Sequence, residues 1–263
     1  MSQGLASVQA DRPLYRVGRR PDTWAWPDWA YAGPDGTFDN RWDDPSGSFR
    51  VLYACSQRVG AFVETLARFR PDLAVVAALA EIDGPDDGPP AGVVPWTWLT
   101  NRASGEAIVS GRFADIGNAN SLATLRTALA KNAIRHRLDE IDGATIRLKA
   151  PRAFTQEVSR FVHDWTDSDG RFTGIRYLSR LGNEFVNWAI FEPPHGEPSP
   201  FESTTTGAIA PDDADLSEAL RILGLRLAEP EARTDVVAFS HPSVCEGDGK
   251  TPTRRGGDLL NDE

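Results

Sequence analysis

Cysteine is scarce in this sequence, and long hydrophobic runs are missing. Cys55 and Cys245 are the only cysteines among 263 residues, and they stand far apart, without metal-ligand spacing. No run approaches the roughly 18 apolar residues that a membrane-spanning helix needs, and residues 1–12 lack the apolar stretch of a signal peptide. We therefore expect a cytoplasmic protein that has no disulfide framework, binds no metal and does not contact a membrane.

Positive charge is also in short supply. The 28 lysines and arginines are outnumbered by 38 aspartates and glutamates, which gives a net charge of −10. This balance disfavours direct binding to nucleic acid or to an anionic membrane. The remaining proportions, 40% hydrophobic and 25% charged residues, are ordinary for a globular protein.

Several well-known catalytic signatures are absent. The sequence contains no Walker loop, no GxGxxG motif after a strand, no GxSxG elbow, no HExxH pair and no internal repeat. No single motif therefore identifies a reaction.

The elements that the residue pattern does indicate are mixed irregularly along the chain. Helical spacing of apolar residues predicts helices at residues 60–69, 121–138, 155–165 and 216–223, the last with Asp215 as its N-cap. Apolar runs bounded by Gly, Pro and Asp predict strands at residues 50–54, 73–82, 93–99, 144–148, 174–178 and 185–192. This irregular order favours the α+β class over a regular βαβ series. We expect a single compact domain of mixed, twisted sheets with flanking helices.

Three polar segments contrast with this body. Residues 1–12 and 240–263 carry little to bury, so we expect them to be flexible. Residues 193–213 are rich in Pro, Gly, Ser and Thr, and we expect a loop there.

Glu64 is the first candidate for chemistry. It lies nearly opposite the apolar stripe of its predicted helix, so the core does not require it. The plainer interpretation is an exposed carboxylate paired with Arg68 four residues on.

Arg16 and Arg41 are candidates for holding a phosphate or carboxylate, because each has an aromatic neighbour in the sequence and guanidinium groups bind such anions in a bidentate manner. The alternative for both is a structural ion pair.

Other candidates rest on position alone. Residues 24–31 (WAWPDWAY) could stack on a ring of a ligand or could pack over the core. Tyr53 and Ser179 stand at predicted strand ends, where side chains can enter a cleft. Cys55 could be a nucleophile, but nothing in the sequence pairs it with a histidine, and a buried small residue is the alternative.

Taken in order, these residues resemble the RES domain family, the toxins of RES–Xre toxin–antitoxin systems. Tyr15-Arg16 and Asn40-Arg41-Trp42 are followed by VLYA at residues 51–54 and AFVETL at residues 61–66. GIRYLSR at residues 174–180 then precedes NWAIFE at residues 187–192. The resemblance covers about residues 14–192, and six short motifs in the right order make it more specific than any one of them.

The resemblance implies an ADP-ribosyltransferase-like α+β fold in a catalytic domain of about residues 13–239 that takes NAD as its substrate, with no metal. The family's two arginines match Arg16 and Arg41, its tyrosine Tyr53, its glutamate Glu64 and its serine Ser179. Glu64 would stabilise positive charge at the anomeric carbon, with Arg41 and Arg16 on the pyrophosphate, Tyr53 on the nicotinamide ring and Ser179 on the ribose or the glutamate. Residues 83–117 would be an enlarged insertion in this domain.

The expected activity is therefore cleavage of the nicotinamide–ribose bond of NAD, by hydrolysis or phosphorolysis, in a toxin neutralised by an Xre-type antitoxin. A protein mono-ADP-ribosyltransferase is one alternative. A binding protein that grips a ligand with Trp24 and Trp26 is another. Water, phosphate or a protein remain open as acceptors, and a homo-oligomer is compatible with the sequence.

Overall fold

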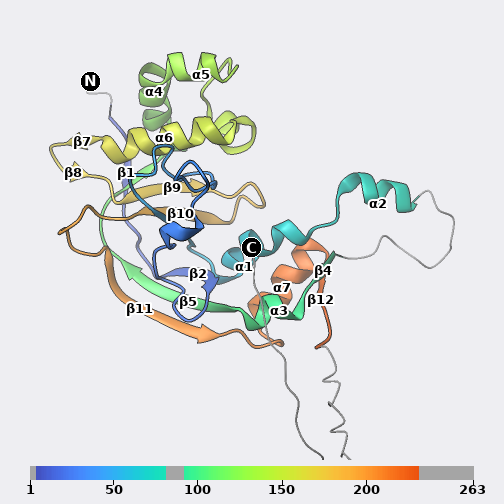
Figure 1. Ribbon diagram of the computed structural model, residues 1–263. Coiled ribbons are helices and arrows are strands. Elements are labelled where there is room, and N and C mark those ends of the chain that lie inside the picture. Colours follow the sequence, from blue (N-terminus) through green and yellow to red (C-terminus); the bar gives the residue numbers. More distant parts are fainter. Residues whose placement is uncertain (1–3, 81–91, 231–263) are drawn as a thin grey trace, which may run out of the picture. The chain divides into compact units, whose positions relative to one another are not determined.

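The computed structural model describes residues 4–80 and 92–230, and its main feature is a mixed sheet of eight strands (Figure 1). The strand order is β1-β6-β9-β10-β3-β2-β5-β11. Neighbouring strands pair antiparallel except β6 and β9, which are parallel. Helices and strands alternate without a regular βαβ order, so the expected α+β class is confirmed.

The bounds of the elements are as follows. The sheet consists of β1 (Ser7–Val8), β2 (Leu14–Arg19), β3 (Val51–Cys55), β5 (Arg102–Val109), β6 (Phe113–Asp115), β9 (Gly174–Leu178), β10 (Val186–Phe191) and β11 (Phe201–Ala208). Two small pairs are β4 (Gly92–Val94) with β12 (Leu225–Leu227) and β7 (Thr166–Asp167) with β8 (Gly170–Arg171). The helices are α1 (Arg58–Leu66), α2 (Leu73–Ala80), α3 (Trp96–Thr100), α4 (Ala119–Ala128), α5 (Ala130–Arg135), α6 (Arg152–Asp164) and α7 (Ala214–Leu223), with short turns η1 (Trp29–Tyr31), η2 (Ala67–Phe69) and the π-helical η3 (Thr145–Lys149).

Side chains alternate between the two faces of the central strands, as the pleat of a strand requires. In β3, Leu52 and Ala54 join one apolar cluster together with Trp188 of β10. Val51 of β3 and Ala189 of β10 join another, which α4 and α6 cover. A third cluster lies under α1 and α7. Of these three clusters, the one under α6 and the one under α1 are separate from each other, and both include residues of the middle strands.

Helix α7 begins two residues earlier than expected, and it is tied to α1. Asp213, not Asp215, is the N-cap: its carboxylate accepts hydrogen bonds from the backbone N–H groups of Asp215 and Leu216. Arg58, the first residue of α1, donates to Asp213 at 2.6 and 2.8 Å and to Asp215 at 2.8 Å. Gly224 ends α7 in the left-handed conformation that glycine adopts most readily.

Three predicted strands are wrong in whole or in part. The apolar run from Leu73 is the helix α2, because an unbroken run of Ala, Val and Leu suits a helix as well as a buried strand. Of residues 93–99, only the beginning belongs to a strand, β4, and the helix α3 follows. Residues 145–149 form the π-helical η3 instead of a strand.

Segments expected to be a flexible terminus, a loop or an insertion also contribute strands. Within residues 1–12, Ser7–Val8 pairs with β6. Residues 193–213 contain β11, whose side chains are almost all exposed, so no alternating apolar pattern marks it. The described part of the supposed insertion, residues 92–117, supplies β5, which pairs with both β2 and β11. The expected tail, residues 240–263, lies outside the described residues.

Candidate functional site

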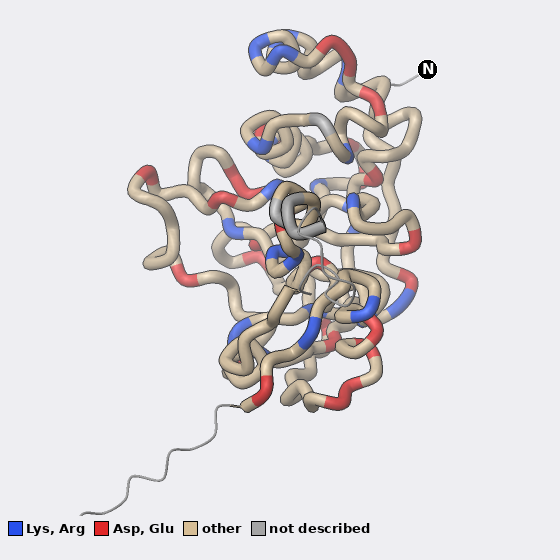
Figure 2. Tube along the Cα trace, turned by 90° about the vertical axis from the view of Figure 1, so that its right-hand side faces the viewer, with Lys and Arg blue, Asp and Glu red and all other residues tan. Residues whose placement is uncertain are grey.

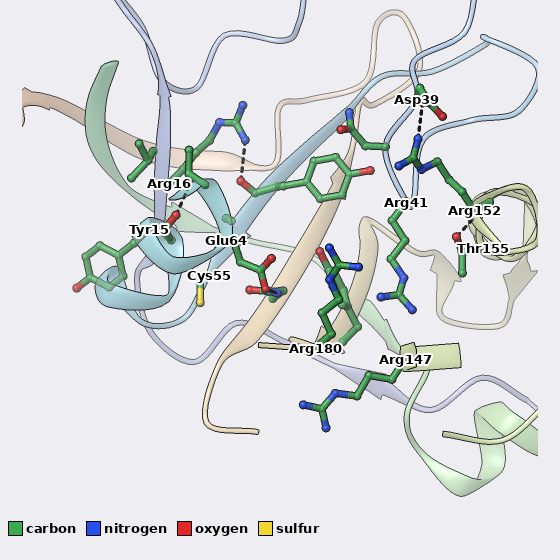
Figure 3. A pocket seen from close by; sticks show the side chains of 18 of the residues that line it. Tyr15, Arg16, Asp39, Arg41, Cys55, Glu64, Arg147, Arg152, Thr155 and Arg180 are labelled. Atoms are coloured by element: carbon green, nitrogen blue, oxygen red, sulfur yellow. Dashed lines mark hydrogen bonds and ion pairs between the residues drawn. The ribbon is translucent and has the colours of Figure 1, made fainter. Parts of the chain in front are cut away.

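A cavity of about 550 Å³ lies between α1 and α6 on one face of the sheet. Ala61, Glu64 and Thr65 of α1 form one wall, and Arg152 and Thr155 of α6 form the other. The volume falls in the usual range of small-molecule sites, roughly 300–1,000 Å³. In Figure 3 the side chains of Glu64, Arg41 and Arg180 extend toward the middle of this space.

The floor of the cavity is a row of side chains across four adjacent strands. Tyr177 of β9 is paired with Asn187 of β10, Asn187 with Cys55 of β3, and Cys55 with Tyr15 of β2. All four residues line the cavity. Hydrogen bonding on both sides of β10 and β3 makes this floor rigid.

Glu64 projects from α1 into the cavity and lies off the apolar side of the helix. Its Oε1 accepts a hydrogen bond of 2.7 Å from Nδ2 of Asn187. The alternative ion pair with Arg68 is not formed, since the Arg68 guanidinium lies 4.8 Å from the centre of the Phe69 ring. Within residues 4–80 and 92–230, Glu64 has no ion pair, so its carboxylate charge is not neutralised by a direct partner.

Arginines gather at another part of the cavity. Arg41 precedes β3, Arg147 comes from η3, and Arg180 from the loop between β9 and β10; all three line the space (Figure 3). Arg41 donates to the backbone carbonyl of Ile146, and Arg147 donates to Oδ1 of Asn183. Arg180 has no hydrogen bond or ion pair to any described residue.

The pKa of Arg41 reflects this crowding. Burial lowers it below its ordinary value and the like charge of Arg180 lowers it further, while Tyr177 and the Glu64 carboxylate raise it in part. Arginine stays protonated at neutral pH despite such shifts. Two neighbouring guanidinium groups that form no ion pair with a carboxylate in the described part of the chain favour an anionic ligand.

Arg16 lines the same cavity, but two of its N–H donors serve the backbone. Nε donates to the carbonyl of Thr23 and Nη1 to the carbonyl of Tyr53, both at 2.7 Å. Burial lowers the pKa of Arg16 to about 10, so the side chain is still charged at pH 7. Its main contacts hold β2, β3 and the segment after β2 together.

Tyr53 lines the cavity, and its hydroxyl is hydrogen-bonded to two residues that precede β3. The hydroxyl donates to Oδ1 of Asp43 at 2.8 Å and accepts from the backbone N–H of Trp42 at 2.9 Å. Burial and the nearby Asp43 carboxylate raise the pKa of Tyr53 well above its ordinary value, so the phenol stays neutral. What Tyr53 offers a ligand is therefore its ring.

Ser179 does not line the cavity in the part of the chain that the structure describes. It is buried, and its Oγ accepts a hydrogen bond of 2.9 Å from the backbone N–H of Leu181. This contact shapes the turn after β9, the turn that carries Arg180.

Of the two interpretations of the aromatic segment 24–31, packing over the core holds for its first tryptophan, whereas Trp29 and Tyr31 are exposed. Trp24 is 4% exposed and donates from its indole N–H to the carbonyl of Thr205, and both Trp24 and Trp26 contact the ring of Phe201.

Cys55 is buried on the cavity floor, and burial raises the pKa of its thiol to about 12. A thiol with this pKa is a poor nucleophile at neutral pH.

Five arginines and two carboxylates line the cavity, although acidic residues outnumber basic ones in the chain. One of the two carboxylates, Asp39, is paired with Arg152, which leaves Glu64 as the free one. Elsewhere the charges are interspersed along the trace seen from the side in Figure 2. The cavity thus offers an unpaired carboxylate and a group of arginines to one ligand.

Comparison with known proteins identifies the family. The model of the RES domain matches residues 13–209. The chain belongs to the RES domain family. The matched region contains every element that lines the cavity, from β2 to β10.

A solved structure is similar to this RES domain at low identity. It is a chain in the crystal structure of the M. tuberculosis MbcT–MbcA toxin–antitoxin complex, with 14% sequence identity and a TM-score of 0.43. The match covers 84% of this chain and 92% of that chain. No curated protein matches the sequence.

Two further observations concern membranes and metals. No helix among the described residues is long and apolar enough to cross a membrane. In residues 4–80 and 92–230, no three His, Cys, Asp or Glu side chains come together as metal ligands.

Proposed function

We propose that this RES domain cleaves the nicotinamide–ribose bond of NAD. The observation that carries the proposal is the charge arrangement in the cavity: an unpaired carboxylate, Glu64, beside a group of arginines. NAD has the matching arrangement, with a cationic nicotinamide at one end and a dianionic pyrophosphate in the middle. Membership of the RES domain family supports the same substrate.

In the proposed reaction the bond between the anomeric carbon and the nicotinamide nitrogen breaks, and its electron pair leaves with the nicotinamide. The leaving group departs neutral, so it needs no proton. Positive charge develops on the ribose, as in other glycosidic cleavages. Glu64 stabilises that charge and orients the acceptor that attacks the anomeric carbon.

The arginines hold the rest of the dinucleotide. Arg41 and Arg180 bind the pyrophosphate, because they are neighbouring guanidinium groups that form no ion pair with a carboxylate among the described residues. Tyr53 presents its ring to the nicotinamide end from a position fixed by Asp43 and Trp42. Fixing both ends of the substrate exposes the reacting bond to Glu64.

Purified protein incubated with NAD, with and without phosphate, tests the proposal by the masses of its products. We expect nicotinamide release, and we expect Glu64→Gln to reduce it on the order of 10²-fold or more. Glu202→Gln, which changes an exposed carboxylate on β11, is the matched control. Normal release by the folded Glu64→Gln variant would rule out the proposed role of Glu64.

The second product identifies the acceptor. Free ADP-ribose indicates water, its phosphorylated form indicates phosphate, and transfer of labelled ADP-ribose to a protein band indicates a mono-ADP-ribosyltransferase.

We further propose that the activity is toxic and is inhibited by an Xre-type antitoxin, a partner that the RES family implies. Co-expression of the antitoxin should restore both growth and cellular NAD; restoration of neither would contradict this part of the proposal.

A further inference from the structure

Asn187 is an unusual residue for its position. It lies in β10, a central strand bonded to β9 and β3, and it is 2% exposed. Asparagine is depleted in strands, where β-branched and aromatic residues pack better. The side chain spans the gap from the sheet to α1, because its Nδ2 donates to Oε1 of Glu64 at 2.7 Å.

The other end of the same amide has no partner. Oδ1 of Asn187 is buried and accepts no hydrogen bond. The Glu64 carboxylate can only accept, so it requires the NH₂ end of the amide and turns the oxygen away from it. A buried acceptor without a donor costs folding free energy, whereas an apolar side chain of the same shape would not. The contact to Glu64 is therefore the only side-chain hydrogen bond that Asn187 makes among the described residues.

We infer that Asn187 is a positioning residue that holds the Glu64 carboxylate toward the substrate; this inference rests on the proposed function. Glu64 is exposed on its helix, and an exposed glutamate samples several rotamers. A hydrogen bond from a rigid central strand selects one of them. A displacement of about 1 Å at a reacting centre reduces rate by roughly 10², so this selection acts on turnover more than on binding.

The test compares activity with stability in Asn187→Leu, which keeps the approximate shape and removes both polar ends. We expect kcat for NAD to fall 10- to 100-fold with KM within about twofold. We also expect the melting temperature to stay the same or rise, because the unpaired acceptor is gone. Asn187→Val, whose β-branched side chain suits a strand, provides a second variant if the leucine does not fit.

Thr124→Val is the matched control for loss of a buried polar group. Its hydroxyl is bonded to the carbonyls of Gly4 and Asn120, in α4 and away from the cavity. We expect this variant to lose stability and keep its kcat. If Asn187 were merely structural, both variants would lose stability, and Asn187→Leu would keep its activity once folded.

A double-mutant cycle shows whether Asn187 acts through Glu64. Asn187→Leu should add no further loss of kcat in a Glu64→Gln background. Full additivity, or an active Asn187→Leu, would overturn the inference while the proposed function stands.

A second readout is independent of turnover. The side-chain amide protons of Asn187 should shift in the NMR spectrum when Glu64 is changed to Gln. If the wild-type protein releases no nicotinamide, the proposed function fails, and an unchanged Asn187 resonance would then refute the hydrogen bond as well.

Discussion

Arg16 and Arg180 line the same cavity but have different roles. Arg16 is held by two backbone carbonyls and serves the sheet. Arg180 is exposed, borders the same space and has no described partner. A guanidinium with two of its five donors already used has less to offer a phosphate than one whose donors are all free. The sequence motifs favour Arg16 as the phosphate ligand, and the contacts favour Arg180.

Replacing Arg180 with alanine should weaken binding of the phosphate groups of NAD specifically. We expect Arg180→Ala to raise KM for NAD about 10-fold or more, the effect of losing a charge-assisted hydrogen bond. Turnover of nicotinamide riboside, which has no phosphate, should stay within about twofold. Steady-state kinetics on both substrates measures the difference, and Arg126→Ala, an exposed arginine paired with Glu140, is the control. Equal losses on both substrates would contradict phosphate binding by Arg180.

At the scale of elements, the position of α1 decides where Glu64 lies. Helix α1 packs against α7 and the strand β2, and Arg58 at its start is bonded to the N-cap of α7. One aspartate therefore both caps α7 and anchors α1. The two helices form a unit that carries one wall of the cavity.

Removing that aspartate should loosen the unit. We expect Asp213→Ala to lower the free energy of unfolding by about 1–2 kcal/mol, from the lost cap and the lost partner of Arg58. The neighbouring Asp212 is exposed and makes no hydrogen bond or ion pair within the described residues, so Asp212→Ala should change stability by no more than about 0.5 kcal/mol. Urea unfolding of both variants measures the effect. Equal stability of the two variants would show that the contacts of Asp213 do not matter.

The elements that the sequence predicts well are those with one apolar face. The spacing of Phe154, Val158 and Val162 predicts α6, and all three side chains are buried. The run that forms α2 has no polar face to reveal its period, and β11 has no apolar face. Periodicity carries no information in either case, so α2 was predicted as a strand and β11 as a loop.

The candidate site divides in a similar way. Glu64, Arg41 and Tyr53 were predicted from family motifs, and all three line the cavity. Arg147 and Arg180 were missed because they come from η3 and from a turn, and only the folded chain brings these segments together. Asn187 begins the NWAIFE motif, but its bond to Glu64 joins residues 123 positions apart and leaves no local pattern.

For the molecule as a whole, paired carboxylates determine the response to acid. Hydrogen bonds from Arg58, Arg50 and Arg112 lower the pKa values of Asp213, Glu192 and Asp167, the last to about 2. A lowered pKa in the folded state stabilises the fold at pH values above the ordinary pKa and loses this effect as the pH falls through the lowered value. Asp43 has the opposite shift, because burial raises its pKa, and it offsets part of the trend.

We therefore expect the free energy of unfolding to decline as the pH drops from about 4 toward 2. Urea titrations at pH 7, 4, 3 and 2 measure the decline. Glu192→Gln should flatten part of the curve because it removes one titrating partner, whereas Glu202→Gln should leave the curve unchanged. A stability that does not vary between pH 4 and pH 2 would contradict the assignment of these pairs.

Helix α1 packs against β2, which is synthesised before it, and against α7, which is synthesised long after it. This order has a consequence for protein synthesis. A ribosome makes Glu64 long before it makes Asn187, which follows 123 residues later, and α7 comes later still. A nascent chain that ends before α7 contains the carboxylate but lacks the helix that packs behind it. Helix α1 gains its packing partner α7 only after residue 223 has left the ribosome. A translation product that stops short of α7 therefore carries Glu64 on a helix that lacks its packing partner.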